Sequence, residues 1–334
     1  MHPENVPLAR ATLHYLATLT GQGYSPETVR LYRENLAQFA DFLGDEPTLA
    51  ELTLESALRY QQHLQQRPQK ATALRRSTGG LSPYTIHQHG RALRSFTTWL
   101  WRHGYLESNR LADFHPGRLP EREVEPLSPA EQQQALAAMD GHTYADARGR
   151  AVVLTLLDSG LRASELCGLT LDGLDLDTGE VRVRRGKGGK ARHVAVGMRT
   201  LAALHVYVYR YRPEPALPAL GEPLFLTQDG YPLTRGSLYL CIRRLRARCG
   251  ISRLTVHLFR HTFAVSYLKA GGDVLTLQRI LGHTSLRMVN HYVHLAHSDV
   301  VARHRRHSPV DRLQLPRTVD RMTRGRSAQR RRPG

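Results

Sequence analysis

The chain has 334 residues, of which 41% are hydrophobic, so it is long enough for about two domains with sizeable cores. Its formal net charge is +18, and lysine and arginine occur along most of its length, which favours a polyanionic partner such as nucleic acid. Charged or polar residues interrupt every apolar run, the N-terminus lacks a signal-peptide pattern, and three cysteines form no paired framework. We therefore expect a cytoplasmic protein with reduced thiols and no membrane partner.

Four amphipathic helices are predicted in the first third of the chain. Ser25-Pro26 and Ser82-Pro83 each supply a capping hydroxyl followed by a proline suited to the first helical position. Apolar residues then recur at helical spacing after both pairs, and two further helices are expected near residues 9–20 and 53–66. Residues 1–114 are therefore predicted to form an N-terminal four-helix domain.

Punctuation by proline and glycine separates this domain from a second one. Residues 115–126 are predicted to be a linker, and the capping box that starts at Ser128 opens a domain over residues 127–306. Between the third and fourth helices, the loop Arg67–Gly80 carries Lys70, Arg75 and Arg76, which either contact DNA or form a solvated charge run. Residues 307–334 are arginine-rich without apolar periodicity, which indicates a disordered basic tail.

The second domain is predicted to be helical around one small β-hairpin. Val181–Arg184 and Arg192–Val196 alternate in polarity at period two, and glycines separate them. The tip, Gly186–Lys190, resembles a phosphate-binding P-loop only superficially, because no Ser or Thr follows a Gly-Lys pair and the turn leads into a strand. A lysine on this tip, Lys187 or Lys190, can reach a ligand without steric hindrance.

Three further segments of the second domain carry residues suited to phosphate chemistry. Arg162 follows a glycine turn at the start of a helix, where its guanidinium can bind a phosphate. His257 and Arg260 are three residues apart and share one helical face. A zinc site at His257 and His261 is disfavoured, because Leu258 stands where a zinc protease has Glu. The third segment is Leu281-Gly282-His283, which Tyr292 follows nine positions later.

In order and spacing these segments resemble the tyrosine recombinase (phage integrase) family, and within it the Xer-type enzymes. The matching words are Gly-Leu-Arg-x-Ser-Glu-Leu, His-x-x-Arg-His-x-Phe-Ala and Leu-Gly-His before a tyrosine. The resemblance covers almost all of the second domain and is looser in the first, which is similar to the family's SAM-like core-binding domain. It assigns the catalytic positions to Arg162, Lys187, His257, Arg260, His283 and Tyr292, and an acidic supporting position to Glu165.

The resemblance implies a transesterification at a DNA phosphodiester without a metal or other cofactor. Tyr292 would attack phosphorus to give a 3′-phosphotyrosine, while Arg162 and Arg260 would stabilise charge on the non-bridging oxygens. His257 would act as base, and Lys187 would protonate the leaving 5′-oxygen. His283 would bind a phosphate oxygen. We also expect Lys190 and Arg192 to contact DNA, and spacing favours Lys187 over Lys190 as the acid.

The implied fold is mainly α, with an α+β catalytic domain that joins the N-terminal domain in a C-shaped clamp around duplex DNA. Partners would be double-stranded DNA and further protomers, as a homotetramer on two sites or with a related recombinase, and DNA-bound protein would be nucleoid-associated. The alternatives are a type IB topoisomerase-like enzyme and a catalytically silent DNA-binding regulator. Within the recombinases, chromosome resolution and mobile-element integration both remain open.

Overall fold

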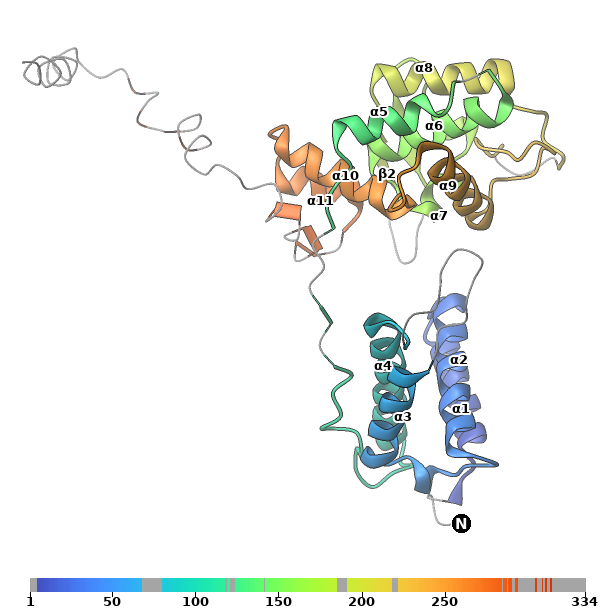
Figure 1. Cartoon of the computed structure of the whole chain (residues 1–334), viewed down its shortest axis with the longest axis vertical. Helices are drawn as coiled ribbons and strands as arrows, with labels where there is room; N and C mark the ends of the chain where they lie inside the picture. Colours follow the sequence, from blue (N-terminus) through green and yellow to red (C-terminus); the bar gives the residue numbers. More distant parts are fainter. Residues whose placement is uncertain are drawn as a thin grey trace, which may run out of the picture. The chain divides into compact units, whose positions relative to one another are not determined.

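The computed structural model describes residues 5–67, 80–117, 119–120, 124–140, 142–184, 191–217, 222–283, 285–286, 288–289, 292–293, 304, 308, 310 and 313. The chain divides into two compact units, Met1–Glu123 and Val124–Gly334 (Figure 1). This division falls inside the interval predicted as a linker. Most of the loop 67–80, the hairpin tip and nearly all of the tail from residue 307 lie outside the described residues.

The first unit is built from four helices. They are α1 (Leu8–Gly21), α2 (Pro26–Leu43), α3 (Leu54–Gln66) and α4 (Pro83–Arg102), with a short 3-10 helix, η2 (Leu49–Glu51), before α3. The predicted serine caps are confirmed: the Ser25 hydroxyl accepts from the backbone N–H of Thr28, and the Ser82 hydroxyl accepts from that of Thr85. Phe39 and Phe96 are fully buried in the core among these helices.

The second unit is helical apart from one hairpin. Its elements are α5 (Pro129–Ala137), α6 (Tyr144–Ser159), α7 (Ala163–Cys167), η3 (Leu171–Gly173), β1 (Glu180–Val183), β2 (Arg192–Ala195), α8 (Met198–Val206), the π-helical turn η4 (Tyr207–Tyr211), α9 (Arg235–Cys249), α10 (Val256–Lys269) and α11 (Val274–Leu281). β1 and β2 pair antiparallel with Val181 opposite Val194. Among the described residues, no helix is long and apolar enough to span a membrane.

Packing of α6 against α10 forms the centre of the second unit (Figure 1). α6 is capped at its C-terminus by Gly160, which has a left-handed backbone with φ of 63°. A side chain is excluded there, because an added Cβ would lie 2.4 Å from Cδ1 of Phe263 on α10. The turn sends the chain directly into α7, so that Arg162 at the N-cap of α7 lies beside the α10 surface that carries Arg260.

Candidate active site

A pocket of about 350 Å³ lies in the second unit. Five of the six predicted catalytic residues line it: Arg162, His257, Arg260, His283 and Tyr292. They come from α7, α10 and the segment after α11, which are far apart in the sequence. The sixth, Lys187, lies outside the described residues, as does Lys190.

Arg260 is the most deeply enclosed cation of this pocket, with a side chain only 4% exposed. Its Nη1 donates to the carbonyl of Gly160 at 2.7 Å, and its Nη2 donates to the carbonyl of Leu281 at 2.8 Å. Burial lowers the pKa of Arg260 to about 10, and the neighbouring Arg162 adds to this effect. The side chain therefore stays charged at neutral pH and is held in one orientation.

The C-terminus of α11 gathers three arginines. The carbonyl of Ile280 accepts from Arg192 Nε at 2.8 Å, and that of Leu281 accepts from both Arg162 Nη1, at 3.2 Å, and Arg260 Nη2. Carbonyls in the last turn of a helix lack intrahelical partners and carry partial negative charge, so they suit cations. This helix end thus brings side chains from three separate elements to one site.

Glu165 provides the acidic counterpart of these arginines. Its side chain is 4% exposed, and its two oxygens accept from Arg192 Nη1 and Nη2, both at 2.9 Å. Arg162 Nη1 also donates to Oε1 at 2.9 Å, and the Arg162 backbone N–H donates to Oε2 at 2.8 Å. Burial raises the pKa of Glu165, but these hydrogen bonds outweigh burial and lower the pKa to about 2.

Arg192 has a different environment from the one expected of a DNA contact. Its side chain is 18% exposed, and its guanidinium is bidentate to Glu165 while Nε is bonded to Ile280. The described contacts tie Arg192 to the base of the site, where it orients Glu165. A direct contact from Arg192 to DNA stays a prediction.

Replacing Glu165 with glutamine is expected to destabilise the fold at neutral pH. Because the folded-state pKa lies below the ordinary value of 4.5, the ionised carboxylate stabilises the fold above about pH 4.5. This contribution, about 3 kcal/mol by linkage, is lost as the pH falls toward 2. Urea unfolding of wild type and Glu165→Gln at pH 7 and pH 3 should show a difference that shrinks in acid. The matched control is Asp172→Asn, at an exposed carboxylate paired with Arg182 and Arg184, and an equal effect there would contradict the prediction.

His283 is held as a neutral imidazole of one tautomer. Its Nε2 lies 2.7 Å from Arg260 Nη2 and must accept, because a guanidinium only donates. Its proton is therefore on Nδ1, which is buried and has no hydrogen-bond partner among the described residues. Burial lowers the pKa of His283 to about 4, and Arg260 and Arg162 reinforce this. The ring is thus uncharged at neutral pH, and it lines the pocket.

His257 and Tyr292 complete the pocket from α10 and from the segment after α11. Burial lowers the pKa of His257, and the charge of Arg260 lowers it further, so the ring is neutral at pH 7 and able to accept a proton. Tyr292 is 6% exposed, and its ring centroid lies 5.4 Å from that of His261 and 6.4 Å from that of His283. These two rings position the tyrosine at the pocket wall.

Sequence reasoning did not identify Arg235 and Tyr239, which also line the pocket and come from the first two turns of α9. Both are exposed, and they are four residues apart, so they share a helical face. The available signal was a helix rich in arginine with an exposed tyrosine. Within the described part of the chain, no group of three or more His, Cys, Asp or Glu side chains could hold a metal ion.

Comparison with known families agrees with this geometry. The profile of the phage integrase family matches residues 125–299, which is more than half of the chain. The chain belongs to this family, and it is a site-specific tyrosine recombinase of the Xer-like type. The predicted fold class, mainly helical with a small hairpin and an N-terminal core-binding domain, is confirmed.

Individual relatives extend the similarity over nearly the whole chain. The chain is 33% identical over 323 residues to tyrosine recombinase XerC 2 of Ralstonia nicotianae, covering 92% of this chain and 89% of that one. It is 32% identical over 288 residues to tyrosine recombinase XerC of Pelobacter propionicus, covering 83% and 87%. A structure of the Tn1549 transposon integrase with transposon right end DNA has the same fold, with a TM-score of 0.69 at 21% identity over 86% of this chain and 94% of that chain.

Proposed function

We propose that the pocket cleaves one DNA strand through a covalent bond to Tyr292 and then rejoins it. The observation that carries this proposal is the meeting of Arg162, His257, Arg260 and His283 with Tyr292 around a single pocket. Together these residues supply a nucleophile, a base and charge stabilisation. A silent DNA-binding protein has no use for such a combination.

In the proposed step, Tyr292 Oη bonds to phosphorus as the bond from phosphorus to the 5′-oxygen breaks. His257 takes the proton of the phenol, because its lowered pKa keeps the ring neutral and able to accept one. Arg162 and Arg260 donate to the non-bridging oxygens, whose negative charge grows in the transition state. His283, whose ring is neutral, would bind a phosphate oxygen. The ester bond energy is retained in the phosphotyrosine, so the reverse step needs no nucleotide.

We propose Lys187 as the acid that protonates the departing 5′-oxygen. Lys187→Ala should slow cleavage of ordinary DNA but recover on a substrate whose 5′-bridging oxygen is replaced by sulfur, because a thiolate leaves without a proton. Single-turnover cleavage of the two substrates measures this. Lys190→Ala is the matched control. Rescue of Lys190→Ala instead would assign the acid to Lys190, and rescue of neither would assign both lysines to phosphate binding.

The proposed reaction is independent of metal ions, because arginine guanidinium groups would stabilise the charge of the phosphate in place of a metal ion. Nicked duplexes with a random central sequence should yield a covalent adduct in EDTA, visible on a denaturing gel, since the nick lets the released fragment diffuse away. Sequencing the trapped DNA then gives the target site. Adduct formation that stops in EDTA and returns with magnesium would overturn metal independence, and no adduct under any condition would overturn the proposed cleavage.

The proposed substrate is duplex DNA. Four protomers would hold two DNA sites together, and they would be either four copies of this chain or a mixture of this chain and a related recombinase. The DNA-bound protein would be located at the nucleoid. Relatives named XerC over most of the chain favour this multimeric reaction over a monomeric topoisomerase. Two trapped sites on one plasmid distinguish them. A recombinase yields exchanged products, whereas a topoisomerase relaxes supercoils without exchange. The genomic position of the trapped site separates chromosome resolution from mobile-element integration.

A further inference from the structure

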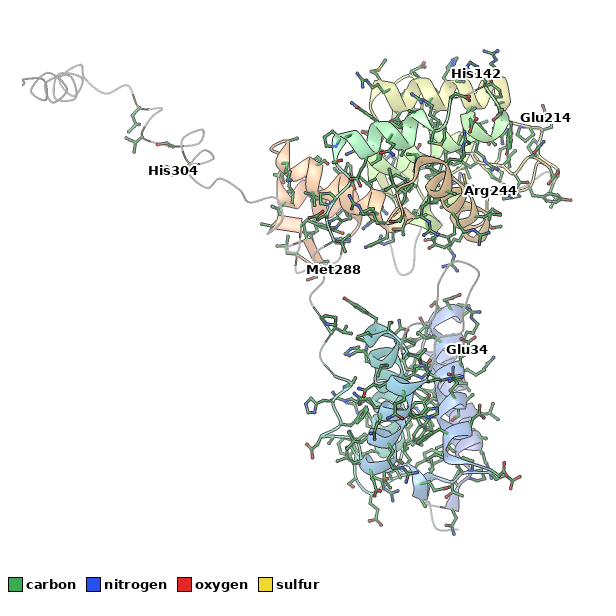
Figure 2. All side chains as sticks on the ribbon, in the orientation of Figure 1. Glu34, His142, Glu214, Arg244, Met288 and His304 are labelled. Carbon is green, nitrogen blue, oxygen red and sulfur yellow. The ribbon has the colours of Figure 1, made fainter. Side chains whose placement is uncertain are left out.

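Helix α9 separates the active-site pocket from a second pocket in the same unit. With 3.6 residues per turn, Arg235 and Tyr239 lie on one side of the helix, whereas Ser237, Arg244 and Arg248 lie on nearly the opposite side. The first pair lines the active-site pocket, and the second group lines the other pocket. Figure 2 labels Arg244 on this helix.

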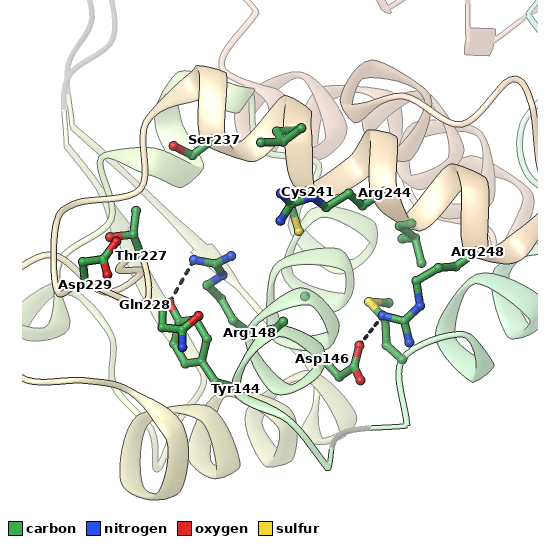
Figure 3. A pocket seen from close by; sticks show the side chains of 15 residues that line it. Tyr144, Asp146, Arg148, Thr227, Gln228, Asp229, Ser237, Cys241, Arg244 and Arg248 are labelled. Atoms are coloured by element: carbon green, nitrogen blue, oxygen red, sulfur yellow. Dashed lines mark hydrogen bonds and ion pairs between the residues drawn. The ribbon is translucent and has the colours of Figure 1, made fainter. Parts of the chain in front are cut away.

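The second pocket, of about 370 Å³, has three walls (Figure 3). One is α9, the second is the start of α6 with Tyr144, Asp146 and Arg148, and the third is the turn Thr227–Asp229. Three arginines and two aspartates line it, so its lining carries a net positive charge. The cationic groups are Arg148, Arg244 and Arg248, and the anionic groups are Asp146 and Asp229.

The two aspartates differ in how they are placed to neutralise the positive charge of the three arginines. Arg248 is paired with Asp146 at 2.5 Å, whereas Asp229 is exposed at the turn. Arg148 Nη1 donates to Tyr144 Oη and to the Leu226 carbonyl, both at 2.8 Å, which fixes its guanidinium in place. Its Nε is buried and has no hydrogen-bond partner in the described part of the chain. Arg244 is exposed and makes no hydrogen bond or ion pair with any described residue.

An anion in this pocket would therefore meet Arg244 as an uncommitted donor, with Arg148 fixed behind it. The position of the two pockets on opposite sides of one helix suits duplex DNA. The width of an α-helix with its side chains is about 10–12 Å, and the major groove of B-DNA is about 12 Å wide. A helix in that groove has a phosphate backbone along each flank.

We propose that Arg244, supported by Arg148, binds a DNA backbone phosphate on the far side of the major groove from the cleaved phosphate. This inference rests on the proposed function, which places the cleaved phosphate beside Arg235 and Tyr239. Between the two flanks, the exposed residues Arg243 and Ala247 face the bases. The contact at Arg244 fixes the depth and direction of α9 in the groove, and it carries no sequence information of its own.

The salt dependence of DNA binding tests the proposal without knowledge of the target. Each phosphate contact contributes about 0.9 to the slope of log affinity against log salt. Arg244→Ala should reduce the slope by about that amount and weaken binding to a labelled random-sequence duplex roughly eight-fold at 0.1 M salt. Arg199→Ala, at an exposed position of α8, removes the same charge elsewhere and should leave the slope unchanged. Asp229→Asn should strengthen binding, because it removes the opposing charge of the pocket.

Footprinting of the covalent complex gives the position of the contact. In wild type, hydroxyl-radical protection should appear across the major groove from the attached phosphate, and Arg244→Ala should lose that protection alone. An unchanged salt slope and footprint in Arg244→Ala would overturn the inference. An equal decrease of the salt slope in Arg244→Ala and Arg199→Ala would also overturn it. Normal DNA binding with loss of exchange between two sites would assign the pocket to a neighbouring protomer and also overturn it. Absence of any wild-type adduct would instead count against the proposed function, and the salt slope would still test the pocket.

Discussion

Tyr292→Phe is expected to abolish the covalent DNA adduct while leaving DNA affinity nearly unchanged. The substitution removes only the hydroxyl that we propose as the nucleophile. The ring is 6% exposed and packs beside His261 and His283, and phenylalanine preserves those contacts. A nicked duplex and a denaturing gel detect the adduct, and fluorescence anisotropy measures affinity.

Tyr267→Phe is the matched control for this experiment. Tyr267 lies on α10 and its ring packs 5.8 Å from that of Phe263, on a part of the fold that does not line the active-site pocket. It should form the adduct at the wild-type level. An adduct that persists in Tyr292→Phe and disappears in Tyr267→Phe would move the nucleophile to Tyr267.

Arg162→Ala is expected to slow single-turnover cleavage by about 10² to 10³, the usual loss on removal of one preorganised donor to a transition-state charge. Its side chain is 40% exposed, so the free energy of unfolding should change little compared with the loss of rate. Chemical denaturation alongside the cleavage assay separates the two effects.

The matched control for Arg162 is Arg182→Ala, which removes an arginine from β1 that pairs with Asp172 at 3.1 Å. Cleavage by this variant should stay within a few-fold of wild type. Arg260→Lys gives a second measurement, because lysine keeps the charge but cannot reach two carbonyls and His283 with one planar group. Wild-type rates in both Arg162→Ala and Arg260→Lys would rule out the proposed charge stabilisation.

Local elements of this fold were predictable from sequence because their signals are local. The hydroxyl caps at Ser25, Ser82 and Ser128 and the period-two alternation of the hairpin each depend on residues a few positions apart. The catalytic candidates were identified from short sequence motifs whose order and spacing match those of the family. The profile match confirms the family, while the roles of the individual residues stay predictions.

Tertiary contacts could not be predicted in the same way. Arg192 faces Glu165 because the hairpin packs beside α7 and α11, and no local pattern encodes that pairing. The carbonyls of α11 that gather three arginines carry no residue-type signature at all. The contribution of α9 to two pockets was also missed, since its two flanks become distinct only when the tertiary fold places the active-site pocket along one of them.

The anchoring of Arg260 by main-chain carbonyls affects how much charge the site can present to a substrate. The carbonyls of Gly160 and Leu281 hold the guanidinium through dipoles at 2.7 and 2.8 Å, whereas the Glu165 carboxylate lies farther from it, at 3.9 Å. With Glu165 as the one carboxylate bonded to Arg162 and Arg192 among the described residues, the three arginines retain a surplus of two positive charges. An enzyme designed for another polyanion could use the same arrangement, in which carbonyls at helix ends fix the arginines and most of their positive charge is retained.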